Sequence, residues 1–182
     1  IEIAPTDWIP YFNRGHVRLE RGDYDNAIAD FSEATRLNPG DDDYRQALIA
    51  AYQRRANASD DRGEFKLAIA DFSEAIRLDP KNAELYFERG NAYVDAEDND
   101  SAIIDFNEAI RLYPDYGFAY FSIGASHHDK GEYDQAIAKY GEAIGRHPSQ
   151  AFLYDYRGEA YHGLGDDDRA LADFGNAIEL DP

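Results

Sequence analysis

The sequence has 182 residues, with 37 acidic and 18 basic side chains, a formal net charge of −19 and no cysteine. This negative charge repels phosphate groups, so nucleic acid is an unfavourable partner. Without cysteine the chain has no disulfides and no thiolate metal ligands. Hydrophobic residues make up 43% of the chain. No apolar run approaches the roughly 20 residues of a membrane-spanning helix, so we expect a folded protein without membrane insertion.

One segment of the sequence returns five times along the chain. It reads AIADFSEATRLNP at 27–39, AIADFSEAIRLDP at 68–80, AIIDFNEAIRLYP at 102–114, AIAKYGEAIGRHP at 136–148 and ALADFGNAIELDP at 170–182. The closing prolines, at 39, 80, 114, 148 and 182, are therefore separated by 41, 34, 34 and 34 residues. A nearly fixed period of this size indicates a repeat protein, in which each unit packs on its neighbours.

Each repeat is predicted to contain two antiparallel helices, as residues 83–114 illustrate. Small and apolar residues recur at helical spacing from Leu85 to Tyr93 and again from Ala102 to Leu112. A polar turn separates the two stretches, and Pro114 ends the second because proline cannot continue a helix. The repeat is therefore predicted to be a pair of helices of about 14 residues each.

Small residues inside the predicted helices indicate where helices pack closely. The first helices share one small position, occupied by Gly15, Ala56, Gly90, Gly124 and Gly158. A glycine inside a helix costs about 1 kcal/mol relative to alanine, so its recurrence indicates that another helix approaches there. Large aromatic side chains of the second helices are expected to fill the space between successive pairs: Phe31, Phe72, Phe106, Tyr140 and Phe174.

These positions resemble the 34-residue tetratricopeptide repeat (TPR). The fourth repeat has the family's aromatic, small, alanine and proline positions at Tyr120, Gly124, Ala136, Ala143 and Pro148. The resemblance covers residues 8–182 and implies an all-α fold, a right-handed superhelical α-solenoid of five antiparallel helix pairs. The repeats would span 8–41, 42–82, 83–116, 117–150 and 151–182, after an N-terminal extension at 1–7.

Two repeats depart from the pattern. The second carries seven additional residues, the difference between the 41-residue and 34-residue steps, within residues 40–65. Seven residues are close to two helical turns, so we expect a lengthened first helix rather than a loop. The third repeat has Glu97 where other repeats have glycine, which predicts a looser turn.

The resemblance also implies that the first helices line a concave wall that binds partners. The residues expected to face it are Phe12, His16, Glu20, Arg54, Asn57, Glu84, Phe87, Glu88, Asn91, Phe118, Phe121, Phe152, Asp155, Tyr156 and Glu159. Phe12, Phe87 and Phe121 each follow a tyrosine that already fills the inner aromatic position, so we expect them at the surface. The alternative, that they pack against adjacent repeats, stays open. An acidic, aromatic groove suits an extended or helical segment with apolar anchors and basic flanks.

The sequence also argues against several other functions. One subset of the family grips the C-terminal carboxylate of chaperones, but Glu84 and Glu88 stand where that subset has cations, so we exclude this role. We identify no catalytic constellation and expect no cofactor. The GDDD segments at 40–43 and 165–168 are expected to cap helix starts rather than bind calcium. We interpret His128 and His162 as solvated side chains rather than metal ligands, and therefore expect no metal site.

The sequence thus predicts a non-enzymatic scaffold for protein–protein interaction, with a basic or amphipathic protein or peptide as its partner. The alternative is a structural self-assembly unit that forms homo-oligomers through the ends of the repeat array. This alternative rests on the fifth repeat, which is followed by no polar helix that would cover its last apolar face.

Overall fold

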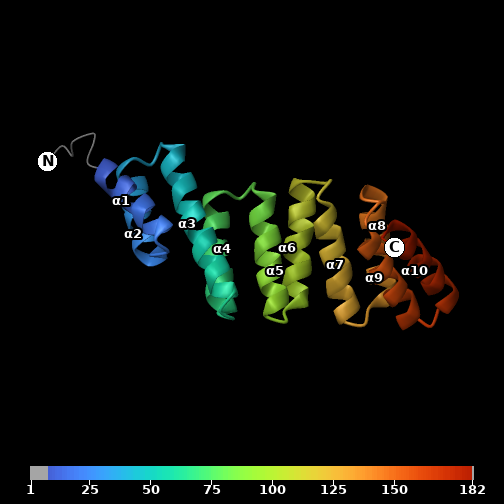
Figure 1. Ribbon diagram of the computed structural model, residues 1–182. Coiled ribbons are helices and arrows are strands. Elements are labelled where there is room, and N and C mark those ends of the chain that lie inside the picture. Colours follow the sequence, from blue (N-terminus) through green and yellow to red (C-terminus); the bar gives the residue numbers. More distant parts are fainter. Residues whose placement is uncertain (1–7, 182) are drawn as a thin grey trace. The chain divides into compact units, whose positions relative to one another are not determined.

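The computed structural model describes residues 8–181, and within that range it contains ten α-helices and no strand (Figure 1). The helices are α1 (Ile9–Glu20), α2 (Tyr24–Leu37), α3 (Asp42–Asp60), α4 (Phe65–Leu78), α5 (Ala83–Asp95), α6 (Asn99–Leu112), α7 (Gly117–Asp129), α8 (Tyr133–Arg146), α9 (Ala151–Gly163) and α10 (Asp167–Leu180). The all-α architecture predicted from the sequence is confirmed.

The chain divides into two compact units, and the division falls within α5, between Leu85 and Tyr86. In unit 1, α1, α2, α3 and α4 contact one another in order, and α1 also contacts α3 directly. In unit 2, the helices from α6 to α10 contact one another in the same way, and α7 also contacts α9. Each unit is therefore a row of helix pairs in which the first helices of successive pairs touch.

Glycines inside the first helices lie directly beneath aromatic rings of the second helices. A Cβ atom built on Gly90 would lie 2.5 Å from the ring of Phe106, and one built on Gly124 would lie 2.6 Å from the ring of Tyr140. Carbon atoms do not approach one another this closely, so only glycine fits at these points. The predicted close approach of the paired helices is thus confirmed, and both rings are fully buried.

An arginine–aspartate pair joins the two helices in four of the helix pairs. The guanidinium donates from Nε and Nη2 to both carboxylate oxygens of an aspartate 16 residues later, at 2.6–2.9 Å. The pairs are Arg14–Asp30, Arg55–Asp71, Arg89–Asp105 and Arg157–Asp173, and all four aspartates are buried. These are bidentate pairs, which are stronger and more directional than single ionic contacts.

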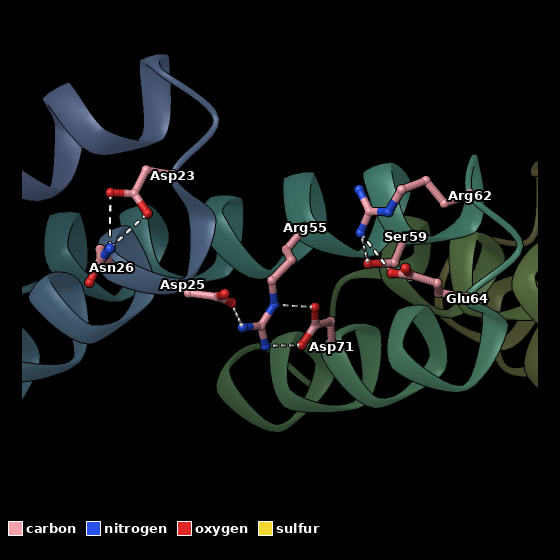
Figure 2. A network of polar contacts seen from close by, with 8 residues as sticks. All are labelled: Asp23, Asp25, Asn26, Arg55, Ser59, Arg62, Glu64 and Asp71. Atoms are coloured by element: carbon pink, nitrogen blue, oxygen red, sulfur yellow. Dashed lines mark hydrogen bonds and ion pairs between the residues drawn. The ribbon is translucent and has the colours of Figure 1, made fainter.

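Within unit 1, one of these arginines also links two helix pairs. Figure 2 shows Arg55 on α3 between Asp71 on α4 and Asp25 on α2, donating to both carboxylates. The hydrogen bond with Asp71 is the largest influence on the pKa of the Arg55 guanidinium, and it raises that pKa. Burial lowers the pKa and the hydrogen bond with Asp25 raises it further, so the net effect is a raised pKa. Arg55 therefore fixes the first helix pair against the second.

The additional residues of the second repeat lengthen its first helix, as their number predicts. α3 has 19 residues, whereas α1 has 12 and α5, α7 and α9 have 13 each. The Asp41 carboxylate accepts a hydrogen bond from the backbone N–H of Asp43 and so caps α3. The extended part of the helix reaches α1, because the ring of Tyr44 lies 4.7 Å from the ring of Phe12 and 4.7 Å from that of Trp8.

The turn at Glu97 is not looser than its counterparts, so this expectation was wrong. Glu97 has a φ of 60°, and the glycines at the same place in the other four pairs have φ between 73° and 80°. The backbone N–H of Asp98 donates to the carbonyl of Tyr93 at 2.8 Å, as that of Glu132 does to His127 at 2.9 Å. The same left-handed, hydrogen-bonded turn therefore forms here even though Glu97 has a Cβ atom.

Candidate partner-binding surface

In unit 1, the residues expected at the binding surface lie mainly on α1 and α3. Phe12 is half-buried, with the ring of His16 edge-on at 4.5 Å and the ring of Tyr44 edge-on at 4.7 Å. His16 is exposed, and its ring also meets that of Phe31 at 5.1 Å. The remaining candidates of this unit are all exposed: Glu20, Arg54, Asn57 and Glu84.

In unit 2, the candidates on α5 are partly covered. The ring of Phe87 is half-buried and lies 4.8 Å from the ring of Tyr116 and 5.5 Å from that of Phe106. Glu88 and Asn91 are also half-buried. Phe87 is therefore covered partly by its own helix pair, through Phe106, and partly by Tyr116 just before α7.

The most exposed aromatic side chains of the candidate set lie on α7 and α9. Phe121 is half-buried between these helices, with Phe152 edge-on at 5.2 Å and Tyr156 edge-on at 5.0 Å. Phe118 is 59% exposed and Tyr156 is 39% exposed. The two helices thus share a cluster of rings in which Phe121 is half-buried and Phe118 and Tyr156 are exposed. We call this the α7–α9 surface, made by Phe118, Phe121, Phe152 and Tyr156.

The charges on the same two helices are almost all negative. Asp129 ends α7, Asp155 and Glu159 lie on α9, and all three are exposed. The single Arg or Lys of α7 and α9 is Arg157, which donates to both oxygens of Asp173 at 2.6 and 2.7 Å. That hydrogen bond outweighs burial and raises the pKa of Arg157. No cation of α7 or α9 therefore stands free beside the aromatic cluster.

The histidines near this surface have partners of their own. His162 Nδ1 lies 2.7 Å from Asp167 Oδ1, and the His128 ring meets that of Tyr133 edge-on at 5.3 Å. Within residues 8–181, no group of three or more His, Asp or Glu side chains is placed to hold a metal ion.

Sequence reasoning did not identify His147, which follows α8. Its ring is exposed and stacks on that of Phe118, with centroids 6.3 Å apart and planes at 28°. The signal that could have revealed it is Gly117, the first residue of α7. A Cβ atom at this position would lie 2.1 Å from His147 Nε2, so the missing side chain is what lets the imidazole ring lie there.

The outward face of α10 exposes apolar side chains. Ile178 is 66% exposed, whereas Ile144, at the same position 34 residues earlier on α8, is 9% exposed and packs against Leu153 of α9. Leu171 and Leu180 are exposed as well. None of the helices in residues 8–181 combines the length and apolar composition that a membrane crossing requires.

Comparisons with known proteins agree with the helix-pair architecture. Tetratricopeptide repeat models match residues 9–41, 83–116, 118–149 and 151–182, and a TPR repeat model matches 57–96. Among curated proteins no significant sequence match is found.

Solved structures with the same fold cover nearly the whole chain. Two crystal structures of MamA are 28% and 29% identical to it, with TM-scores of 0.74 and 0.71. They cover 96% and 91% of this chain and 92% and 93% of their own. YrrB, a TPR protein with an unusual peptide-binding site, is 22% identical with a TM-score of 0.74, covering 98% of this chain and 89% of its own. The chain therefore belongs to the tetratricopeptide repeat family, and its helix pairs form an α-solenoid.

Proposed function

We propose that this protein is a non-catalytic interaction scaffold that binds a basic peptide or amphipathic helix of a partner protein. The observation that carries the proposal is the α7–α9 surface, where exposed rings stand among exposed carboxylates. Phe118 and Tyr156 keep much of their side-chain surface exposed to water. Aromatic side chains left at a surface in this way are typical of binding hot spots.

The charge distribution supports a basic partner. Asp155 and Glu159 are exposed and face no free cation on α7 or α9, so an incoming lysine or arginine could pair with them. The net charge of −19 would speed the approach of such a partner and slow that of an acidic one. YrrB shares the fold and has a peptide-binding site, so a solenoid of this kind can bind peptides.

Selection from a random peptide display library tests this proposal. Wild-type protein should enrich sequences that combine Lys or Arg with apolar residues, and their binding should weaken as salt rises. Phe118→Ala with Tyr156→Ala should lose the enriched sequences. The matched control is Ile104→Ala, which removes an apolar side chain of α6 that is 69% exposed. Enrichment of acidic sequences, or equal enrichment by the double variant, would contradict the proposal.

A second candidate function is self-association through α10. It is favoured by the exposure of Leu171 and Ile178 on α10. The equivalent residues of α8, Ile137 and Ile144, pack in clusters that include residues of α9. Light scattering over a concentration series tests it. If copies associate here, Leu171→Lys with Ile178→Lys should hold the protein monomeric, whereas Ile104→Lys should leave the association unchanged. A wild-type protein that stays monomeric throughout the series would rule this candidate out.

A further inference from the structure

A small pocket opens on the α7–α9 surface and has a volume of about 210 Å³. Its apolar walls are Phe118 and Phe121 from α7 and Phe152 and Leu153 from α9. Three of these four side chains are phenyl rings, and Leu153 forms a buried floor. Such a lining favours an apolar occupant, because a polar group placed there would lose hydrogen bonds to water without gaining others.

The walls of the pocket are held in place before any partner arrives. Phe121 and Phe152 meet edge-on at 5.2 Å, and Tyr156 supports Phe121 from the other side at 5.0 Å. His147 closes one end by stacking on Phe118, and Gly117 provides the room for the imidazole ring. A pocket with fixed walls costs a ligand less ordering entropy than one that must form on binding.

We infer that this pocket takes one bulky apolar side chain, aromatic or branched aliphatic, from an extended basic segment of a partner protein. The inference rests on the proposed function, since it assigns the anchor point of the same interaction. A cavity of about 150 Å³ lined by leucine, isoleucine and phenylalanine can hold benzene, so one of about 210 Å³ has room for a phenyl or isobutyl group.

The surrounding charges define what flanks the anchor residue. Asp155 lies one helical turn beyond Phe152 on α9, and Glu159 follows after one more turn. Seven residues of α-helix span about 10 Å, and an extended peptide advances about 3.3 Å per residue. Basic residues within about three positions of the anchor can therefore reach these carboxylates. Gln150 stands at the pocket with an exposed amide that can bond to a peptide backbone.

The test uses the full chain and a labelled peptide of alternating lysine and serine with one variable central residue. Fluorescence anisotropy should show that peptides with central Phe or Leu bind about tenfold more tightly than the Ala peptide. Phe118→Ala should remove this preference, so that the Phe, Leu and Ala peptides bind the variant with similar affinities. Gly117→Ala, whose Cβ would displace the His147 ring, should weaken the preference as well. Ile104→Ala is the control that should retain it.

A second readout locates the bound side chain. With ¹³C-labelled leucine methyl groups, the Phe peptide should shift the Leu153 signal and the Ala peptide should not. The pocket assignment would be overturned if the preference survived Phe118→Ala, or if the wild-type protein bound peptides with every central residue equally well. In either case the proposed binding of a basic partner would still stand. If no peptide of the series binds and no leucine signal moves, the pocket assignment and the proposed function both fail.

Discussion

Ile123 on α7 and Lys139 on α8 occupy the two positions that hold the arginine–aspartate pair in the other four helix pairs. The Ile123 side chain is fully buried, and the Lys139 ammonium donates to Glu142 Oε1 of its own helix at 2.8 Å. In this helix pair, a buried isoleucine and a lysine that pairs within its own helix replace the bidentate ion pair. The fold therefore accepts two different residue combinations at this place.

Removing one partner from an intact pair should be costly. We expect Asp105→Ala to lower the free energy of unfolding by about 3 kcal/mol, because Arg89 would be left half-buried without its carboxylate. The control is Glu108→Ala on the same helix, which breaks the surface pair with Arg111 and should cost less than about 0.5 kcal/mol. Urea unfolding followed by circular dichroism measures both. Equal losses would show that the Arg89–Asp105 pair contributes no more than a surface contact.

Installing the pair where it is missing should show strong coupling. Ile123→Arg alone is expected to lower the free energy of unfolding by about 3–5 kcal/mol, because it places an unpaired charge at a buried position. Adding Lys139→Asp should recover about 2 kcal/mol of that loss, which a double-mutant cycle would report as a coupling energy. Additive effects of the two substitutions would mean that the positions do not meet across α7 and α8.

Acid should weaken the first helix pair through Asp30. Burial opposes ionisation of this carboxyl group, but Arg14 and Arg18 outweigh it and hold the pKa of Asp30 below its ordinary value. As the pH falls, the unfolded chain takes up this proton before the folded one. The stabilisation is therefore complete above the ordinary pKa of about 4 and is lost as the pH falls through the lowered value. The stability gap between wild type and Asp30→Asn should narrow from pH 7 to pH 3; a constant gap would contradict this.

Glu97→Gly is expected to stabilise the protein. The left-handed conformation costs a residue with a Cβ atom roughly 1–2 kcal/mol, and glycine avoids most of this cost, so a gain of about 1 kcal/mol should appear in urea unfolding. Gly131→Ala makes the reverse change at a turn with a φ of 74° and no atoms within 4 Å of the new Cβ. Gly131→Ala should lower the free energy of unfolding by a similar amount. If Glu97→Ala gained as much as Glu97→Gly, the effect would not come from the backbone.

Tyr140→Phe should also raise stability. The Tyr140 hydroxyl is buried, and within residues 8–181 it has no hydrogen-bond partner; burial also raises its pKa. Phenylalanine fills the same place in the other four repeats, so the ring is accommodated without a hydroxyl group. Removing the Tyr140 hydroxyl should therefore raise the free energy of unfolding by about 1 kcal/mol, as measured by thermal or urea unfolding. Tyr154→Phe is the contrast, because Tyr154 donates to the Pro148 carbonyl at 3.1 Å and should lose stability. A destabilised Tyr140→Phe variant would show that the hydroxyl has a stabilising partner.

The helix pairs and the lengthened α3 could be predicted because their signals are local. Periodic alanines, interior glycines and closing prolines lie within a single repeat, and the two-turn length of the insertion preserved helical phase. The Arg55–Asp71 pair escaped notice because its members lie 16 residues apart and each looks like a solvated charge when taken alone. Its recurrence at the same spacing in other repeats is the signal that could have revealed it.

The candidate surface was harder to predict, because burial depends on the neighbouring helix pair. The sequence alone left open whether Phe87 and Phe121 face outward. Phe87 is half-buried against Tyr116, just before α7, and Phe121 is half-buried against Phe152 of α9. The pocket depends on Gly117 and His147, which stand thirty residues apart. Neither residue is notable in the sequence by itself, because the pocket depends on the space that the missing Gly117 side chain leaves for the His147 ring.

The contact between Trp8 and Tyr44 makes the first unit optically distinct. Trp8 is the only tryptophan of the chain, and its ring lies 4.7 Å from that of Tyr44 at the start of α3. Indole emission therefore reports on the surroundings of α1 and α3, whereas far-ultraviolet dichroism averages over every helix. A denaturation curve recorded by both signals would reveal, without any labelling, whether the two units melt in a single cooperative step or one after the other.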